Sequence, residues 1–552
     1  MLEKMSPNQR LIIALALSFV FFIAYTTVFP PPPVEEESKV EKVALKEADS
    51  QVAPTETKAK ANVGHEINSL EKVSATSSNT LVTLTSDKFT LTIDTLGRIS
   101  SNILSDEKYF NSASDKIAQM ITPNGAKPLQ IRFADDIVNN TSQSTPYTTT
   151  VEQAVITETK PVKVVLTQTL PEVTIEKTLT FFNDGHYDVA IKLSNDKRYF
   201  VYLGQRPNVS DQMMTVMGNM IYAGDGLTTI YEDGDVEGRT TFNDVHLLSA
   251  FDQYYANIFY NVNPDVNILV ERDRDNNPIT YMDGSKNFNF SAYSGPKNYV
   301  TLKTIDPVLV NAIEYGWFTF AAKPLFAVLL WLNGIFGNWG WAIIALTIIV
   351  RILLYPLTYK GMLSMAKLKD IAPKVKEVQA KYKGDPQRMN VAVMDMYKKH
   401  GANPLGGCLP LLLQIPVFFA IYRVLLNAVE LQGAPWIFWI TDLAKMDPTY
   451  ILPIFMGATM YYQQKITPNN FTDPLQEKVF KFLPVIFTFF FITFPAGLVL
   501  YWAVNNILSI AQQFMVNKAF DKMKKDRHEQ HLAEKHHGKD KEDSKDKENG
   551  KN

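Results

Sequence analysis

The run WGWAIIALTIIVRILLYPLT, residues 339–358, decides the fold class of this chain. It is long enough to cross a bilayer as a helix, which takes about 20 mostly apolar residues. Further apolar runs follow it, at 408–429, 450–464, 479–494 and 497–516. Together they predict a membrane α-helical bundle in the second half of the chain.

Another apolar run lies near the start of the chain, at 11–29, after Lys4 and Arg10. A cleaved signal peptide is the alternative interpretation, but the run is long for one and lacks a small-x-small cleavage site before the prolines that follow. We therefore expect an N-terminal signal-anchor helix in residues 1–30. Residues 31–80 are rich in Glu, Lys, Ser, Thr and Ala, and are predicted to form a disordered linker.

After the linker, apolar residues alternate with a period of two. Runs such as 81–85 and 162–167 predict strands, and Asn183-Asp184-Gly185 is a strong turn signal. Many short strands without intervening helices predict an all-β sandwich over 81–305. Cys408 is the only cysteine, so an intramolecular disulfide is impossible.

The basic residues predict how the spans are oriented. Lys and Arg next to spans stay in the cytoplasm, which puts the N-terminus inside and the β-domain outside. Segment 359–403 has ten Lys and Arg against four Asp and Glu, so it also lies inside. This agrees with six spans only if 310–336 lies along the outer interface, anchored by Trp317 and Trp331, instead of crossing. The charged tail 518–552 is then cytoplasmic.

The basic segment is predicted to form a helical hairpin. An apolar stripe at spacings of three and four, from Leu368 to Tyr382, marks its first helix, and Gly384-Asp385-Pro386 separates the two helices. One interpretation is a connector that touches anionic lipid headgroups. The other is a docking arm for incoming chains or the ribosome, with Lys369, Lys376 and Lys383 on its exposed face.

Arg351 lies roughly 10 Å inside the membrane, at a rise of 1.5 Å per residue. A charge there costs at least about 2.5 kcal/mol, and the other spans offer no acid at its depth. Snorkelling is one explanation, and a cavity that holds water or a polar client segment is the other. Thr347 shares the face of Arg351, Gln414 adds an amide, and Ile343 and Leu500 are expected to point outward. A polar stripe on the last span is predicted to close the opposite wall: Tyr501, Asn505, Ser509, Gln512 and Gln513. Single residues of this kind also simply hold helices together.

The sequence contains no Walker A, HExxH or GxSxG motif. Ser364-Met365-Ala366-Lys367 matches S-x-x-K without companion motifs. We therefore expect no enzyme, no cofactor and no metal site. A secondary transporter or channel is the competing class, but it would carry paired intramembrane ionisable groups or inverted repeats, and the sequence shows neither.

Longer motifs resemble the YidC-type membrane protein insertases in their Gram-negative form, over essentially residues 1–525. They are WGW at 339–341 with RILLYPLT at 351–358, NPLGGCLP at 403–410, QIP at 414–416, FPAGLVLYW at 494–502 and YSGPK at 293–297. The resemblance implies insertion, folding and assembly of integral membrane proteins in the inner membrane, alone or with the Sec translocon, through a hydrophilic groove.

The same resemblance implies six transmembrane helices, five of them forming an insertase core within 337–517, and a periplasmic β-supersandwich. It makes Arg351 the groove arginine and Thr347, Tyr501 and Trp502 substrate contacts; some relatives have Tyr where Trp502 stands. The polar groove is completed by Gln414 and Asn505. Expected partners are nascent or newly made membrane proteins, the Sec translocon, the ribosome and membrane lipids, but not DNA.

Overall fold

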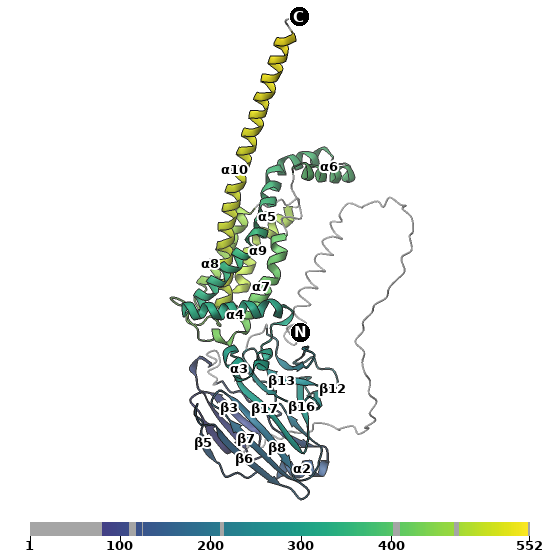
Figure 1. The fold of residues 1–552 in the computed structure, drawn as a ribbon, viewed down its shortest axis with the longest axis vertical. Coiled ribbons are helices and arrows are strands. Elements are labelled where there is room, and N and C mark those ends of the chain that lie inside the picture. The colour runs from purple at the N-terminus through teal and green to yellow at the C-terminus, as the bar shows by residue number, and fades with distance from the viewer. Residues whose placement is uncertain are drawn as a thin grey trace, which may run out of the picture. The chain divides into compact units, whose positions relative to one another are not determined.

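The computed structural model describes residues 80–109, 118–123, 125–209, 215–382, 384–400, 409–467 and 474–549. The predicted signal anchor, the linker up to residue 79, the NPLGG motif and Lys383 lie outside the described residues. Within them, a β-rich domain is followed by a set of long helices (Figure 1).

The β-domain contains three sheets. The four-stranded sheet has the order β3 (Ile99–Leu104), β2 (Phe89–Asp94), β1 (Thr80–Thr85), β5 (Gln153–Val155). The eight-stranded sheet has the order β11 (Thr228–Glu232), β10 (Gly218–Ala223), β13 (Val245–Phe251), β14 (Tyr255–Tyr260), β17 (Asn287–Pro296), β8 (His186–Leu193), β7 (Thr174–Phe181), β6 (Val162–Thr169). The five-stranded sheet has the order β12 (Thr240–Phe242), β15 (Ile268–Arg272), β16 (Pro278–Gly284), β9 (Tyr199–Tyr202), β4 (Ile131–Phe133).

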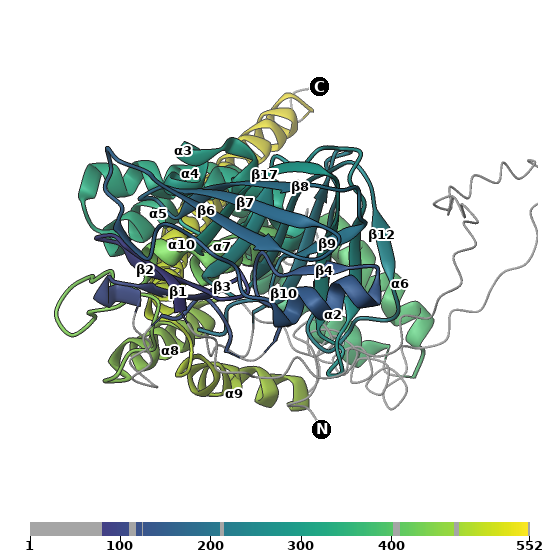
Figure 2. The same ribbon diagram turned by 90° about the horizontal axis from the view of Figure 1, so that it is seen from below.

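Both smaller sheets pack against the eight-stranded sheet (Figure 2). The Asn102 amide on β3 donates to Ser294 Oγ on β17, at 2.9 Å. The Asn219 amide on β10 donates to Thr280 Oγ1 on β16, at 2.7 Å. The strands at β1, β2 and β6 to β8 alternate buried and accessible residues, as the period of two predicts. The prediction of packed β-sheets is confirmed, but the domain is β-rich rather than all-β, because the helix α2 (Asp136–Ser144) lies between β4 and β5.

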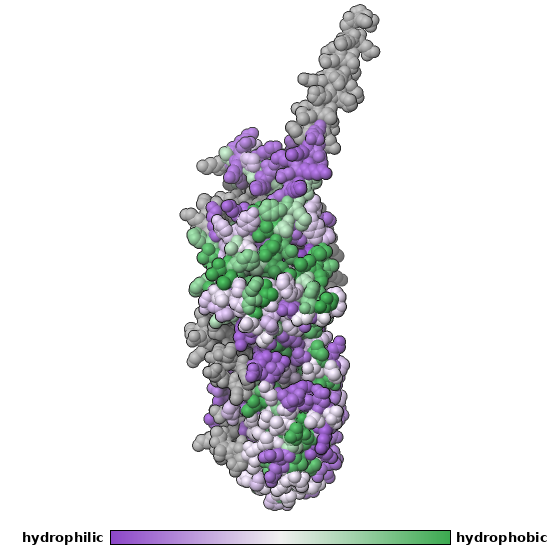
Figure 3. Space-filling model, turned by 90° about the vertical axis from the view of Figure 1, so that its left-hand side faces the viewer, coloured by the Kyte–Doolittle hydropathy of each residue, from purple (hydrophilic) through white to green (hydrophobic). Residues whose placement is uncertain are grey.

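The helical region begins with the short helices α3 (Tyr299–Ile305), η3 (Pro307–Ala312) and η4 (Gly316–Phe318). The longer helices are α4 (Thr319–Phe336), α5 (Trp339–Lys381), α6 (Pro386–Lys399), α7 (Leu409–Asn427), α8 (Ile451–Ile466), α9 (Pro474–Phe491) and α10 (Ala496–Asn549). Each predicted apolar run after residue 337 therefore overlaps one long helix, although the runs at 408–429 and 479–494 extend past the ends of α7 and α9. Hydrophobic surface gathers in a band over these helices (Figure 3).

Two helices extend further than the apolar runs predict. Helix α5 continues for 43 residues, through Pro356 and Pro373, into the first arm of the predicted hairpin. The reason is local, because the first strong stop after Trp339 is Gly384-Asp385-Pro386. There the Asp385 carboxylate caps α6 by accepting from the Arg388 amide, at 3.0 Å. Helix α10 likewise continues from the last apolar run through the charged tail.

The two arms pack through the predicted apolar stripe. Leu368, Ile371 and Val375 on α5 are buried, and they contact Val393, Met396 and Tyr397 on α6. The apolar spacing therefore predicted this packing correctly. The cytoplasmic location of the two arms stays a prediction.

Helix α4 runs crosswise to α5 (Figure 1). Gly337, with φ of 61°, ends α4 in the left-handed conformation, and Asn338 caps α5 by accepting from the Trp341 amide. One face of α4, including Phe326, packs against the core, whereas Trp331 on another face is 62% exposed. Both α4 and α5 are long and apolar enough to cross a membrane. The interfacial position of 310–336 therefore stays a prediction.

Candidate functional site

Arg351 on α5 is only 7% exposed and lies against α10. Its Nε donates to Asn505 Oδ1 at 2.8 Å, and its Nη1 donates to Gln512 Oε1 at 3.2 Å. Its Nη2 donates both to the Asn505 carbonyl oxygen, at 3.1 Å, and to Ser509 Oγ. All four acceptors are uncharged. In this conformation the guanidinium is enclosed and hydrogen-bonded.

The polar stripe on α10 is therefore the direct partner of Arg351 rather than a separate opposite wall. Positions 505, 509 and 512 are four and three apart, so they share the face of α10 that meets α5. A buried guanidinium without an acid beside it is tolerable because these groups replace its lost hydration. We call Arg351, Asn505, Ser509 and Gln512 the arginine clasp.

The other predicted polar positions are less closely associated with Arg351. Thr347 is 1% exposed, and its hydroxyl donates to the Ile343 carbonyl oxygen on the same helix, at 2.7 Å. Tyr501 is 3% exposed, and its ring centroid lies 6.5 Å from that of Phe418 on α7. Gln414 is half-buried on α7. Thr347 and Tyr501 therefore offer almost no free surface in this conformation.

Trp502 belongs to an aromatic cluster that sequence reasoning did not single out. Its ring centroid lies 4.6 Å from that of Phe418 on α7, and 5.0 Å and 6.1 Å from those of Phe491 and Phe487 on α9. The cluster joins three helices around a half-buried tryptophan. Its members come from uniformly apolar runs, in which the sequence marks no residue above its neighbours.

The expected outward direction of Ile343 and Leu500 is wrong. Ile343 is 1% exposed and packs beside Gly497 at the start of α10, and Leu500 is 2% exposed. The exposed side of α5 is instead at Ile352 and Leu353, which are 66% and 73% exposed. Ile343 lies four residues before Thr347 and eight before Arg351, so helical spacing in fact puts it on their buried face. For Leu500, the surrounding run is apolar on every face and carries no periodicity that distinguishes a packed side from a lipid-facing one.

Comparison with known proteins identifies the family. Residues 331–525 match the model described as "60Kd inner membrane protein", and 276–328 match the "YidC periplasmic domain". A protein from Campylobacter jejuni named membrane protein insertase YidC is 46% identical over 93% of this chain and 97% of its own length. This chain belongs to the YidC family. YidC relatives from Wolinella succinogenes and Helicobacter pylori are 44% and 42% identical; they match 95% and 97% of this chain and 97% and 100% of their own lengths.

Membership of the YidC family confirms the resemblance inferred from the motifs. The β-rich domain and the helical region are those of a YidC protein with a periplasmic domain, which agrees with an inner-membrane location. The relatives are named as insertases, not as enzymes, and nothing in the comparisons supports the alternative of a transporter or channel.

Two of the three lysines proposed for docking lie on α5 beyond its apolar part. Lys369 and Lys376 are exposed, and Lys383 lies outside the described residues. Asp370, which follows Lys369 on α5, forms an ion pair with Lys524 on α10. The basic arm is therefore attached to the extension of α10.

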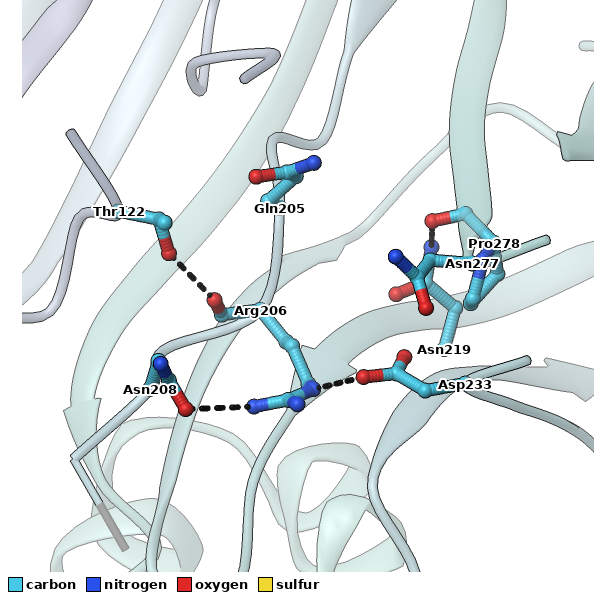
Figure 4. Close-up of a pocket in the computed structure, with 8 residues that line it drawn as sticks. All are labelled: Thr122, Gln205, Arg206, Asn208, Asn219, Asp233, Asn277 and Pro278. Carbon is cyan, nitrogen blue, oxygen red and sulfur yellow. Dashed lines mark hydrogen bonds and ion pairs between the residues drawn. The ribbon is translucent and has the colours of Figure 1, made fainter. Parts of the chain in front are cut away.

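A polar pocket in the β-domain of this YidC protein lies apart from the arginine clasp (Figure 4). It is lined by Thr122, Gln205, Arg206, Asn208, Asn219, Asp233, Asn277 and Pro278. Arg206 forms an ion pair with Asp233 and a 3.4 Å hydrogen bond with Asn208, and Thr122 donates to its carbonyl oxygen. Burial raises the pKa of Asp233 despite that ion pair. These side chains are largely engaged with one another, so the pocket is not our candidate for a client site.

Proposed function

We propose that this chain receives hydrophobic segments of newly made membrane proteins from the cytoplasm and releases them into the inner membrane. The observation that carries the proposal is the arginine clasp, a set of hydrogen-bonding groups inside an apolar helical bundle of the YidC family. Such groups lower the cost of burying a client's hydrophilic flank. The apolar part of the client then partitions into lipid, driven by about 25 cal/mol per Å² of buried surface.

The proposed client groove combines polar and aromatic side chains. Arg351, Asn505 and Gln414 form its polar part, and Thr347, Tyr501 and Trp502 are the proposed contacts. Since Thr347 and Tyr501 are buried, contact with them requires α5, α7 and α10 to separate. Trp502 is more accessible, and its neighbours in the aromatic cluster offer an apolar surface to the client.

Site-specific photocrosslinking tests this function. A photoreactive residue at Trp502 should crosslink a ribosome-bound, single-span nascent chain, and the purified protein should insert that chain into liposomes. Matched probes at Ile352 and Leu353 face away from the bundle and should crosslink poorly. Equal crosslinking from all three positions would contradict a client groove beside α10.

The topology of the chain in the membrane is also a proposal. The charge distribution supports six spans, both termini in the cytoplasm, the β-domain in the periplasm and 310–336 at the outer interface. With Cys408 replaced by Ala, a cysteine at Lys381 should resist a membrane-impermeant thiol reagent added to spheroplasts. A cysteine at Lys286, exposed on the β-domain, should react. Labelling at Lys381 without lysis would refute this topology.

The basic arm is proposed to attract client chains or ribosomes through its positive field. The double variant Lys369→Glu, Lys376→Glu should slow insertion about 3-fold at low salt. The effect should be smaller at high salt, because salt screens exposed charges. Protein abundance should not change. Reversal of Lys160 and Lys286 on the β-domain is the control for total charge. If insertion and ribosome co-sedimentation of the Lys369→Glu, Lys376→Glu variant match those of this control, the basic arm is a connector that contacts lipid.

We also propose that the chain associates with the Sec translocon, which copurification tests.

A further inference from the structure

The segment between α7 and α8 carries an uncharged turn that is rich in aromatic residues. The run LQGAPWIFWIT, residues 431–441, contains no Asp, Glu, Lys or Arg. The Trp436 amide donates to the Ile440 carbonyl oxygen at 3.0 Å, and the Ile440 amide donates to the Ile437 carbonyl oxygen at 3.1 Å. These two hydrogen bonds close the chain over residues 436–440, which we call the aromatic turn.

The tip of the aromatic turn is both strained and exposed. Phe438 has a φ of 52°, in the left-handed region that a residue with a Cβ atom disfavours. It is 85% exposed, and its ring stacks on that of Trp439 with a centroid distance of 6.0 Å. Packing inside the protein therefore does not explain an aromatic residue at this position, where glycine would be less strained.

The aromatic turn is attached to the joint between α4 and α5. The Asn338 side-chain amide donates to the carbonyl oxygens of Pro435 and Trp436, at 3.1 and 3.2 Å. The Trp436 ring also lies so close to α5 that it leaves no room for a Cβ atom at Gly340. Anything that fixes the position of the turn therefore also fixes the position of this joint.

The aromatic turn continues the exposed side of α5. The ring of Trp341 packs edge-on against that of Trp436, with centroids 5.9 Å apart. Trp341 shares a face of α5 with Ile348 and Ile352, seven and eleven residues later, and the three are 45%, 39% and 66% exposed. Arg351 is buried on the face that meets α10. The surface that the turn extends is therefore apolar and accessible, and it is not the surface of the arginine clasp.

We propose that the aromatic turn is a lipid anchor, which places Phe438 and Trp439 at the boundary between the headgroups and the acyl chains of the bilayer. Tryptophan is enriched at this boundary because its ring is apolar and its N–H is polar. Burial of the Phe438 ring in lipid offsets the strain of its backbone. The anchor thereby holds the joint between α4 and α5 at this depth. Only the assignment to the outer leaflet rests on the proposed topology, which the labelling at Lys381 tests separately.

Spin labels measure the depth of the turn. In the full chain with Cys408 replaced by Ala, a nitroxide on a cysteine at Phe438 would be studied in phosphatidylcholine liposomes. Its collision rates with oxygen, which concentrates in lipid, and with a water-soluble nickel chelate give an oxygen-to-nickel ratio. A label at Ile352 is the lipid reference, and a label at Ile137, which is 75% exposed on α2, is the water reference. The ratio at Phe438 should lie between the two references and severalfold above that at Ile137.

Two results of this measurement would refute the lipid anchor. A ratio at Phe438 equal to that at Ile137 would place the turn in water. Low collision rates with both reagents would mean that protein covers the turn, such as a second copy of this chain.

The effect on the joint is measured with a label at Ile335, which is 58% exposed near the end of α4. Phe438→Gly removes the ring and accepts a positive φ, so its Tm in detergent should be no lower than that of the wild-type protein. The ratio at Ile335 should fall about twofold in Phe438→Gly and stay unchanged in Phe438→Trp, which keeps an aromatic ring. An unchanged ratio in Phe438→Gly, or equal falls in both variants, would show that the ring does not hold the joint. A lower Tm for Phe438→Gly would mean that Phe438 stabilises the protein by internal packing, which also contradicts the proposal.

Discussion

Arg351→Glu is expected to reduce client insertion by at least about a hundredfold, since burying a carboxylate without a partner charge costs several kcal/mol. The variant places a carboxylate beside the Asn505 carbonyl oxygen and the oxygens of the clasp, which now face an acceptor. Arg351→Ala removes the charge and leaves the acceptors without their donor. Arg351→Lys keeps the charge but cannot reach Asn505, Ser509 and Gln512 together, so it should be the mildest of the three.

Initial insertion rates in liposomes measure this order, with thermal unfolding in detergent as the check on fold. Clients with acidic flanks should suffer most, because the field of the arginine favours negative charge in transit. Arg198→Glu, on an exposed arginine of the β-domain, is the control for charge reversal. Wild-type rates for Arg351→Ala with every client would make the arginine dispensable for insertion.

Periodicity predicted most of the elements but not their tertiary partners. The strands at β1, β2 and β6 to β8, the stop at Gly384-Asp385-Pro386 and the stripe from Leu368 to Val375 lie where the sequence places them. These features depend on neighbours within a few residues, so local spacing is sufficient to find them. The continuity of α5 beyond Thr358 was missed because the apolar run ends there, although the helix continues to Lys381.

The contacts of the arginine clasp could not be predicted from the sequence. The sequence marks Arg351 as costly and Asn505, Ser509 and Gln512 as one stripe, yet the register between α5 and α10 decides that they bond to each other. That register depends on packing such as Ile343 against Gly497, which leaves no trace in a uniformly apolar run. The same limit explains why Leu500 was assigned to the wrong side, whereas the spacing of Ile343 from Thr347 and Arg351 would have placed it correctly.

The partner of Arg423 is likewise not the one that its position in the sequence suggests. Its position near the end of its apolar run suggests an interfacial arginine within reach of Glu430. In the structure its Nη1 instead lies 3.6 Å from Glu314 Oε2, and both side chains are largely buried, at 18% and 8% exposure. The Asn427 amide also donates to the Glu314 carbonyl oxygen, at 2.8 Å. This ion pair joins α7 to the segment that leads from the β-domain into α4.

Arg423→Met should therefore destabilise the protein by about 3–5 kcal/mol, because it leaves the Glu314 carboxylate buried and unpaired. Insertion should fall with it, since α7 carries Gln414 and Phe418 of the proposed groove. Thermal unfolding in detergent and insertion rates measure the two effects. The matched control is Lys445→Met, which breaks the more exposed Lys445–Asp442 pair and should cost only about 0–1 kcal/mol.

The double variant Arg423→Met with Glu314→Met separates the charge from the packing. Replacing both members of a buried ion pair by apolar residues of similar volume is often neutral or stabilising, so the pair should recover most of the stability lost in the single variant. Recovery of insertion along with stability would show that the ion pair acts by fixing α7 beside α4. Recovered stability without recovered insertion would mean that Arg423 acts on the client itself. If Arg423→Met alone is as mild as Lys445→Met, the pair contributes little and α7 is held by its apolar contacts.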